Sequence, residues 1–283
     1  MNTFNNIVKS PIEEIEKIEL DLLLDAIYRC YGYDFRGYAL PFIQRRVHHR
    51  LRNEKLPSIS ALQEKILHDP TVMQNLFCDF SINVTEMFRD PSFFKALRTK
   101  VLPKIKDKST IRIWHIGSST GEEVYSMSIL LHEEGLYEKA KIYATDINEE
   151  NIKKAKKGVF SIDGMQQYTQ NYFEAGGKRS FSEYYKAIGE QVIFRPYLQT
   201  NVIFAQHNLV TDHSINEFDI IICRNVLIYF NKELQNKVHQ LLYESLCLEG
   251  YIGLGKREGI KFTSYGNRYE EFDATEKLYR KYR

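Results

Sequence analysis

The sequence has 283 residues, of which 43% are hydrophobic and 27% charged, and its formal net charge is +2. This composition is typical of an ordinary globular protein and excludes a disordered or fibrous chain. The small net charge does not favour general nucleic-acid binding, and the length allows one large domain with a smaller companion.

The four cysteines are widely separated and form neither a C-x-x-C pair nor a metal-ligand cluster with histidine. We therefore expect a reduced, cytoplasmic protein with no metal site. The first residues, MNTFNNIVKS, show no basic segment followed by an apolar run, so we expect no secretory leader. No apolar run approaches the roughly 20 residues that cross a bilayer, so we expect no membrane insertion.

Apolar residues recur at helical spacing between residues 18 and 80. Pro57-Ser58 and Pro70 indicate two helix starts inside this region. The segment SINVTEMFR follows and ends at Arg89, where we place a domain boundary. The sequence therefore predicts an N-terminal all-helical domain, with an interdomain segment, over residues 1–89.

After residue 109 the pattern changes to strands that alternate with helices. The β-branched run 111–116 precedes a glycine turn and an apolar helix, and the unit repeats from residue 141. Such alternation predicts an α/β domain over residues 90–283, with a Rossmann-like, doubly wound, mostly parallel sheet. Between about 158 and 200 the alternation breaks, and we predict a small antiparallel β insertion there.

The strongest motif is IRIWHIGSSTGEEVYS at residues 111–126, followed by IYATDIN at 142–148. In a doubly wound sheet the ligand binds outside the carboxyl ends of the strands. There the first loop meets a helix N-terminus, and an acid at the next strand end binds ribose hydroxyls. Gly117 and Gly121 let the backbone approach such a ligand, and Asp146 supplies the acid. These strings predict a nucleoside site.

Two consecutive carboxylates indicate which nucleoside fits. Glu122 and Glu123 lie where a dinucleotide would place its pyrophosphate, and the loop lacks the G-x-G-x-x-G pattern. Negative charge repels phosphate but suits a cationic sulfonium nucleoside that carries an amino group. S-adenosylmethionine therefore fits better than NAD. The alternative is that both glutamates only favour a helix N-terminus through its dipole.

Five strings match, in order and spacing, the motifs of the chemotaxis receptor methyltransferase (CheR) family: NVTEMFR (83–89), GSSTGEEVYS (117–126), ATDIN (144–148), HNL (207–209) and CRNVLIYF (223–230). The chain resembles this family from about residue 18 to residue 255. The resemblance implies a class I methyltransferase fold, S-adenosylmethionine as cofactor and S-adenosylhomocysteine as product. It also implies methylation of glutamate side chains on chemoreceptor-like proteins, a signal-transduction step in chemotaxis adaptation.

The resemblance assigns roles to single positions. The implied cofactor contacts are Asn83, Thr85, Arg89, Glu122 or Glu123, Asp146, Asn208, Leu209, Arg224 and Asn225, and the loop pattern adds Gly117. Among them, Asn208 and Leu209 resemble contacts on the adenine side, and Arg224 and Asn225 resemble contacts near the methionine moiety. Arg89 and Tyr229 match the pair at the methyl-transfer centre.

The implied reaction needs no general base. A glutamate side chain has an ordinary pKa of ~4.3, so it is already an ionised nucleophile at neutral pH. The site has to align a carboxylate oxygen with the methyl group, and such positioning is worth up to ~7 to 11 kcal/mol. Arg89, with its planar fork, is our candidate for that role, with Tyr229 as a second donor. Alternatively, Tyr229 is a helix-capping aromatic residue with a satisfied hydroxyl.

Basic residues gather on the second predicted helix. Positions 45, 48, 49 and 52 share one face at helical spacing, and our candidates for substrate binding are Arg45, Arg46, His49 and Arg52. The resemblance implies acidic helical segments of a receptor as partner, and complementary charge would steer their encounter. A solvated surface helix is the other interpretation. We do not expect nucleic acid as partner, although such clusters also bind phosphate.

One string departs from the family pattern. Many members have Gly-His-Ser-Glu after the last core strand, where this chain has Gly255-Lys-Arg-Glu258. The charged pair Lys256 and Arg257 either alters substrate choice or belongs to a tolerant surface loop. The β insertion matches in place a family subdomain that in some members docks a receptor peptide as an added strand, and for this chain that docking is left open.

Two other functions stay open from the sequence. A methyltransferase acting on RNA or a small molecule would modify a base-stable nitrogen or carbon atom. A non-catalytic, cofactor-binding signalling module would bind the nucleoside without methyl transfer. We expect the chain to be a monomer.

Overall fold

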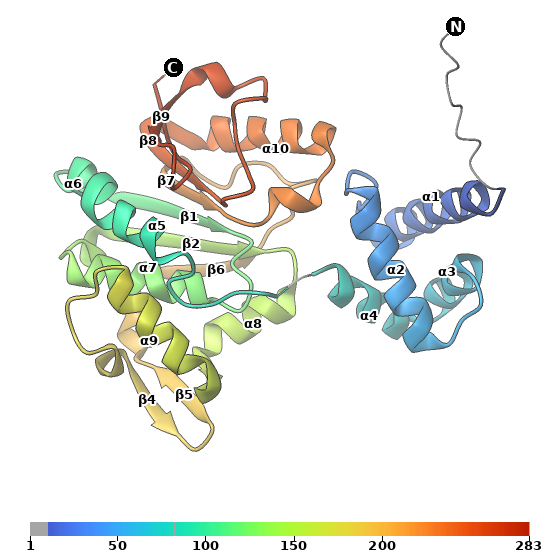
Figure 1. The fold of residues 1–283 in the computed structure, drawn as a ribbon, viewed down its shortest axis with the longest axis horizontal. Coiled ribbons are helices and arrows are strands. Elements are labelled where there is room, and N and C mark those ends of the chain that lie inside the picture. The colour runs from blue at the N-terminus through green and yellow to red at the C-terminus, as the bar shows by residue number, and fades with distance from the viewer. Residues whose placement is uncertain (1–10, 82, 283) are drawn as a thin grey trace, which may run out of the picture. The chain divides into compact units, whose positions relative to one another are not determined.

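The computed structural model describes residues 11–81 and 83–282 (Figure 1). Residues 1–10, from which we expected no secretory leader, lie outside the described residues. Contacts divide the chain into two units. The residues before Asn83 group with Tyr229–Leu234, and Asn83–Ile228 groups with Gln235–Arg283. The boundary that we predicted after Arg89 lies further along the chain than this division.

The first unit is helical, and its elements are α1 (Pro11–Tyr31), α2 (Leu40–Glu54), α3 (Ile59–His68) and α4 (Pro70–Phe80). The predicted all-helical domain is confirmed. Helix α3 begins where Ser58 Oγ accepts a hydrogen bond from Ala61 N, at 3.2 Å. Helix α4 begins at Pro70, after the Asp69 carboxylate accepts from Thr71 N at 2.9 Å. Both helices begin where an N-cap residue or a proline in the sequence indicates a helix start.

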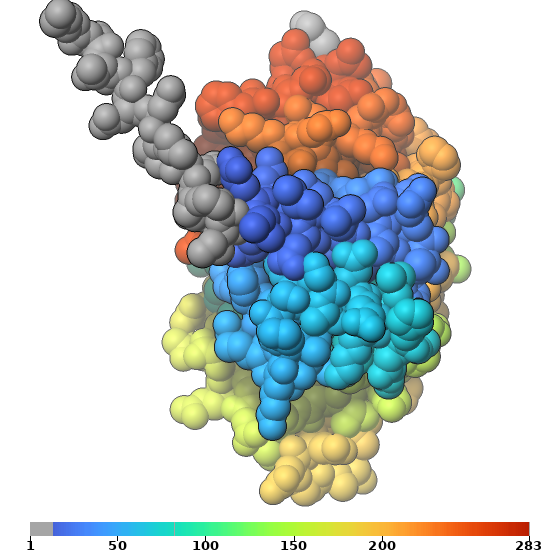
Figure 2. Space-filling model, turned by 90° about the vertical axis from the view of Figure 1, so that its right-hand side faces the viewer, coloured from blue at the N-terminus to red at the C-terminus, as the bar shows by residue number. Residues whose placement is uncertain are grey.

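The helices of this unit pack through their apolar faces. Helices α1 and α3 lie side by side, as Figure 2 shows on one face of the unit, and α4 packs against both α2 and α3. Leu23, Ile27, Val47, Leu62 and Leu76 are fully buried among them. Among the described residues of the chain, no helix is long and apolar enough to cross a bilayer.

The second unit contains a sheet in the order β6-β2-β1-β7-β8-β10-β9. Its strands are β1 (Ile111–Ile116), β2 (Ala140–Asp146), β6 (Val202–Gln206), β7 (Phe218–Cys223), β8 (Leu246–Leu254), β9 (Tyr269–Asp273) and β10 (Leu278–Lys281). The pairs β1–β2, β2–β6, β1–β7 and β7–β8 are parallel, whereas β10 is antiparallel to β8 and β9. The predicted mostly parallel, Rossmann-like sheet is confirmed; the β9–β10 hairpin was not predicted.

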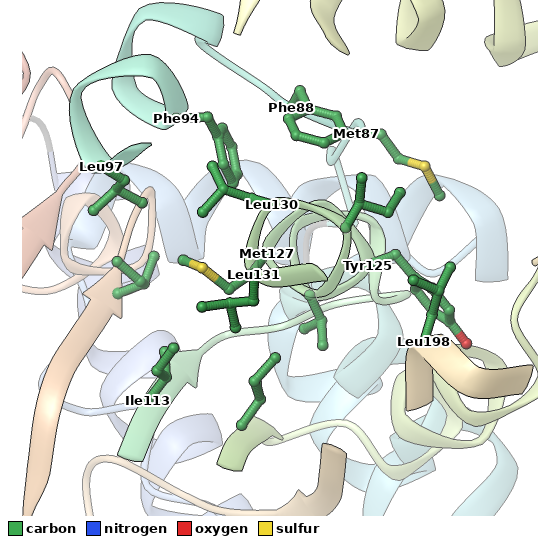
Figure 3. Packing of buried hydrophobic residues seen from close by; sticks show 14 of the residues in the cluster. Met87, Phe88, Phe94, Leu97, Ile113, Tyr125, Met127, Leu130, Leu131 and Leu198 are labelled. Atoms are coloured by element: carbon green, nitrogen blue, oxygen red, sulfur yellow. The ribbon is translucent and has the colours of Figure 1, made fainter. Parts of the chain in front are cut away.

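Strand β7, FDIIIC, is buried along its whole length, as expected of a central parallel strand covered on both faces. The helices of this unit include α5 (Pro91–Ala96), a short π-helix (Leu97–Val101), α6 (Leu102–Ile105), α7 (Glu122–Glu133), α8 (Glu149–Lys157) and α9 (Met165–Glu174). Helix α10 (Lys232–Ser245) follows β7. Figure 3 shows α7 end-on, with Leu130 on the side of Phe88 and Phe94 and Leu131 on the side of Ile113. All five side chains are buried, so α7 is the centre of this core.

The predicted antiparallel insertion is confirmed as a sheet of β3 (Val159–Ser161), β5 (Gln191–Phe194) and β4 (Tyr185–Ile188), in that order. It also contains helix α9, which was not predicted. The helix buries Met165 and Tyr172, one on each of its end turns, within a run rich in glutamine and tyrosine. The many β-forming aromatic residues of this run concealed its helical spacing, since tertiary packing overrides propensity.

Candidate functional site

The loop from β1 to α7 is held against the end of β2. Ser118 N donates to Thr145 O at 2.9 Å, and Ser119 N donates to Asp146 Oδ2 at 2.9 Å. Gly121 has φ 101°, and a Cβ there would lie 2.9 Å from Ala155 Cβ. Glycine is therefore required for both the turn and the close approach of the loop to α8.

Asp146 is the buried acid at the end of β2. Besides Ser119 N, its carboxylate accepts from Asn148 N at 2.8 Å and from Asn151 Nδ2 at 3.2 Å. Burial raises the pKa of Asp146, and these donors oppose that rise. The structure places the residue where the sequence predicted it, at the strand end beside the glycine loop.

Two more predicted segments meet this acid. Asn83 Oδ1 accepts from Asn151 Nδ2 at 2.7 Å, which ties the NVTEMFR segment to the start of α8. His207 N donates to Asp146 O at 3.1 Å, so the HNL segment also adjoins it. Within the HNL segment, Asn208 Oδ1 accepts a hydrogen bond from Val210 N at 3.0 Å, which forms a turn. The side chains of Leu209 and Thr85 are half-buried. The sequence did not single out Asn151, although an asparagine one turn into a helix after a strand-end acid is a usable signal.

The two glutamates at the start of α7 have different surroundings. The Glu122 carboxylate accepts from Thr120 Oγ1, at 2.7 and 2.9 Å, and from its own backbone amide, and no cationic side chain among the described residues pairs with it. Burial raises its pKa. Burial would also raise the pKa of Glu123, but Arg224 and His115 outweigh it and hold that pKa at about 2. Glu122 is therefore the carboxylate that suits a cationic ligand.

Arg224, which we expected near the methionine moiety, is enclosed by protein groups. Its Nη1 donates to Glu123 Oε2 at 2.6 Å and to Arg89 O at 3.1 Å, and its Nη2 is paired with Asp90. Its guanidinium carbon lies 4.2 Å from the centre of the Phe93 ring. Any contact of Arg224 with a cofactor has to be made alongside these bonds, and its role there stays a prediction.

The loop that carries Asn225 is braced by a residue to which the sequence assigned no role. The Glu258 carboxylate accepts from four backbone amides, those of Asn225, Val226, Leu227 and Gly255, at 2.6 to 2.9 Å. Asn225 itself adopts φ 61°, a conformation that needs such support. A carboxylate four residues past Leu254, the end of β8, was the available signal.

The predicted methyl-transfer pair falls in the two units, so each residue is described in its own. Arg89 belongs to the second unit, where its Nη1 donates to Val84 O at 2.7 Å. Tyr229 groups with the helical unit: its carbonyl accepts from Ala39 N at 2.8 Å, and its ring centre lies 4.9 Å from that of Phe42. Their joint catalytic role stays a prediction.

The basic face of α2 is present as predicted. Arg45 and Arg52 are exposed and form no ion pair with any described side chain, while Arg46 and His49 are half-buried. The neighbouring Arg50 is a structural residue instead: its Nε donates to Asp79 Oδ2 at 2.8 Å, and its side chain is 11% exposed. Arg50 is off the face formed by positions 45, 48, 49 and 52, and the binding role of that face stays a prediction.

The sheet topology and the glycine loop beside a strand-end acid define a class I S-adenosylmethionine-dependent methyltransferase. The chain belongs to the CheR methyltransferase family. Residues 83–277 match the CheR methyltransferase SAM binding domain, and residues 18–81 match the CheR methyltransferase all-alpha domain. The family expected from the five strings and its cofactor, S-adenosylmethionine, are thereby confirmed.

Curated relatives align with most of the chain. Cher3 of Pseudomonas putida, named as a methyltransferase, is 47% identical over 93% of this chain and 97% of its own length. Proteins named chemotaxis protein methyltransferase from Listeria monocytogenes and Borreliella burgdorferi are each 27% identical. The first covers 85% of this chain and 92% of its own length; the second covers 96% and 97%.

The residues present fit the cofactor. Its sulfonium and amino groups are cationic, and Glu122 offers a buried carboxylate that no cation of the described chain neutralises. The buried Ser118 Oγ has no hydrogen-bond partner among the described residues and can serve a polar ligand atom. A dinucleotide phosphate would meet the Glu122 carboxylate instead and be repelled. Nowhere in the described ranges do histidine, cysteine and acidic side chains form a group that could hold a metal ion.

Proposed function

We propose that this methyltransferase transfers the methyl group of S-adenosylmethionine to glutamate side chains of a chemoreceptor-like protein. The observation that carries the proposal is the alignment, over both domains, with relatives named chemotaxis protein methyltransferase. The substrate carboxylate is already ionised at neutral pH, so the protein has only to orient it and exclude water.

In the proposed reaction, the cofactor supplies an electrophilic methyl group on a positively charged sulfur. One glutamate oxygen would bond to that carbon as the carbon–sulfur bond breaks, and the products would be a neutral methyl ester and neutral S-adenosylhomocysteine. Arg89 holds the other oxygen through its guanidinium group, and Tyr229 adds a hydroxyl donor. Glu122 binds the cationic end of the cofactor, and Asp146 binds the ribose.

The partner in this proposal is a protein with acidic helical methylation segments. Arg45 and Arg52 offer two exposed guanidinium groups on one face of α2, and complementary charge of this kind sets register and speeds encounter. A monomeric state and a cytoplasmic location are part of the proposal.

The test is tritium transfer from methyl-labelled S-adenosylmethionine to a receptor fragment that contains the acidic helices. We expect label that alkali releases as volatile methanol, because a carboxyl methyl ester hydrolyses in base. Base-stable label would indicate a methyltransferase of another substrate class. Tight nucleoside binding without any transfer would indicate a non-catalytic module.

Two variants separate the proposed roles. Asp146→Ala should mainly weaken cofactor affinity, measured by calorimetry. Arg89→Ala should mainly lower kcat while the cofactor still binds. Equal loss of affinity and turnover in both variants would contradict the division of roles.

A further inference from the structure

A row of five side chains connects strand β1 with the loop after β8. They are His115, Glu123, Arg224, Asp90 and Lys256. His115 Nδ1 lies 3.4 Å from Glu123 Oε1, and Arg224 joins Glu123 to Asp90. At the outer end, Lys256 Nζ lies 3.0 Å from Asp90 Oδ1. Asp90 is therefore bound on both carboxylate oxygens, by a different cation on each.

The two cations on Asp90 differ in exposure. The side chain of Arg224 is 2% exposed, whereas that of Lys256 is 59% exposed. Arg224 is fixed by Glu123, by the Arg89 carbonyl and by the Phe93 ring. Removing Arg224 would leave the half-buried Glu123 carboxylate without its cation, whereas removing Lys256 exposes one oxygen of Asp90 to water. Lys256 is thus the member of the row that can be changed without unfolding the protein.

The backbone around Arg89 needs external support. Phe88 and Asp90, on either side of it, adopt φ 51° and 55°, which L-residues rarely occupy. On the N-terminal side, Phe88 N donates to Ser126 Oγ at 2.8 Å, and Asn171 Nδ2 donates to Met87 O at 3.0 Å. On the C-terminal side, the support comes from the ion pairs of Asp90. Such conformations persist only where the surrounding contacts determine them.

We propose that Lys256 is a positioning residue that, through Asp90, fixes the orientation of the Arg89 backbone for methyl transfer. Its catalytic consequence rests on the proposed role of Arg89. The lysine that departs from the family string is then neither a substrate contact nor a tolerated surface charge. Lys256 is the exposed end of the row, and it pairs with Asp90, the residue that follows Arg89.

Hydrogen exchange of the free protein tests whether Lys256 fixes the backbone around Arg89. In Lys256→Met, peptides covering residues 83–90 should exchange faster than in the natural protein, while the core strands β1 and β7 keep their protection. Lys256→Arg should restore the slow exchange. Lys261→Met is the matched control, because Lys261 is an exposed lysine of the same loop that pairs with Glu271 at 2.6 Å. Unchanged exchange in Lys256→Met would overturn the proposal.

Kinetics test the catalytic part. We expect Lys256→Met to lower kcat by about two- to fivefold, the range of an exposed ion pair, with KM for the cofactor unchanged. The loss should be absent when Lys256→Met is made in an Asp90→Asn background, since the pair is then already broken. Additive losses, or a change in substrate KM alone, would mean that Lys256 acts elsewhere and would overturn the proposal.

The two measurements separate this inference from the proposed function. Hydrogen exchange requires no substrate, so a failure of glutamate methylation would refute the proposed function and leave the exchange result interpretable. If Lys256→Met exchanges faster but keeps the kcat of the natural protein on a receptor fragment that the enzyme methylates, the positioning role is refuted.

Discussion

Glu122 and Glu123 are consecutive carboxylates with opposite pKa shifts. Burial acts on both, but only Glu123 has Arg224 and His115 beside it, so its pKa falls to about 2 while that of Glu122 rises. The sequence predicted an acidic loop and could not say which carboxylate faces the ligand. The difference depends on Arg224, which lies far along the chain and meets Glu123 only in the folded sheet.

The raised pKa of Glu122 predicts a linkage between cofactor binding and protons. A cationic ligand favours the ionised carboxylate, so binding should release a proton near the pKa of the free protein. Affinity should therefore rise as pH increases through that pKa and level off above it. Calorimetry at one pH in buffers of different ionisation enthalpy measures the released proton.

The control for this linkage is Glu122→Gln, which should abolish the buffer-dependent heat and weaken binding by roughly tenfold, as for a hydrogen bond to a charged group. Glu150→Gln, an exposed carboxylate on α8, should change neither quantity. Proton release that survives in Glu122→Gln would assign the titration to another group.

Glu258 predicts a large effect of a small change. Glutamine keeps the size of the side chain but replaces one oxygen with a donor, so two of the four amides would face an NH2 group. We expect Glu258→Gln to destabilise the protein by roughly 2 kcal/mol or more, in urea denaturation. Glu249→Gln, an exposed carboxylate, should cost little, and equal losses would contradict the bracing role.

At the scale of elements, the order of strands and helices could be predicted from the sequence because local patterns determine it. The helical spacing before residue 80 and the β-branched runs from 111 each determine a face that must be buried. Helix α9 and the β9–β10 hairpin were missed for a different reason. Tyr172 packs against Phe88 and Tyr269 against Tyr243, so part of what buries each ring comes from elements distant in sequence.

One buried carboxylate holds several elements of the second unit together. Glu133, at the end of α7, accepts from Tyr184 Oη and Lys178 N, each at 2.9 Å, and is also bonded by Tyr172. Arg98 Nη2 lies 2.6 Å from its other oxygen, and the Glu133 side chain is 1% exposed. These bonds connect the insertion to α7 and to the π-helix that contains Arg98.

This arrangement predicts that Glu133→Gln costs about 3 kcal/mol of stability, because it leaves Arg98 with a weakened partner and buried donors unmatched. Glu134→Gln is the matched control: Glu134 also pairs with Arg98, but its side chain is 21% exposed. Denaturant unfolding should show a clearly smaller loss for Glu134→Gln. A loss as large as that of Glu133→Gln would mean that the charge on Arg98, not the buried network, decides the stability.

At the scale of the whole molecule, the chain combines a cofactor domain with a small helical domain that carries the basic face of α2. The cofactor domain accounts for Asp146, Glu122 and the braced loop at Glu258. The helical domain contributes Arg45 and Arg52 and groups with the segment that contains Tyr229. In the proposed function, the first supplies the methyl group and the second selects an acidic partner.

That division predicts how charge reversal on α2 changes the kinetics. Arg52→Glu should lower kcat/KM for an acidic receptor fragment by roughly threefold at low salt, because steering is lost, and should leave kcat unchanged. The difference from the natural protein should shrink as ionic strength rises to about 0.15 M, where the screening length is about 8 Å. Lys17→Glu makes the same change in net charge on exposed α1 and is the matched control. An equal fall in both variants would show that net charge alone matters, and a fall in kcat for Arg52→Glu would place Arg52 in the methyl-transfer step.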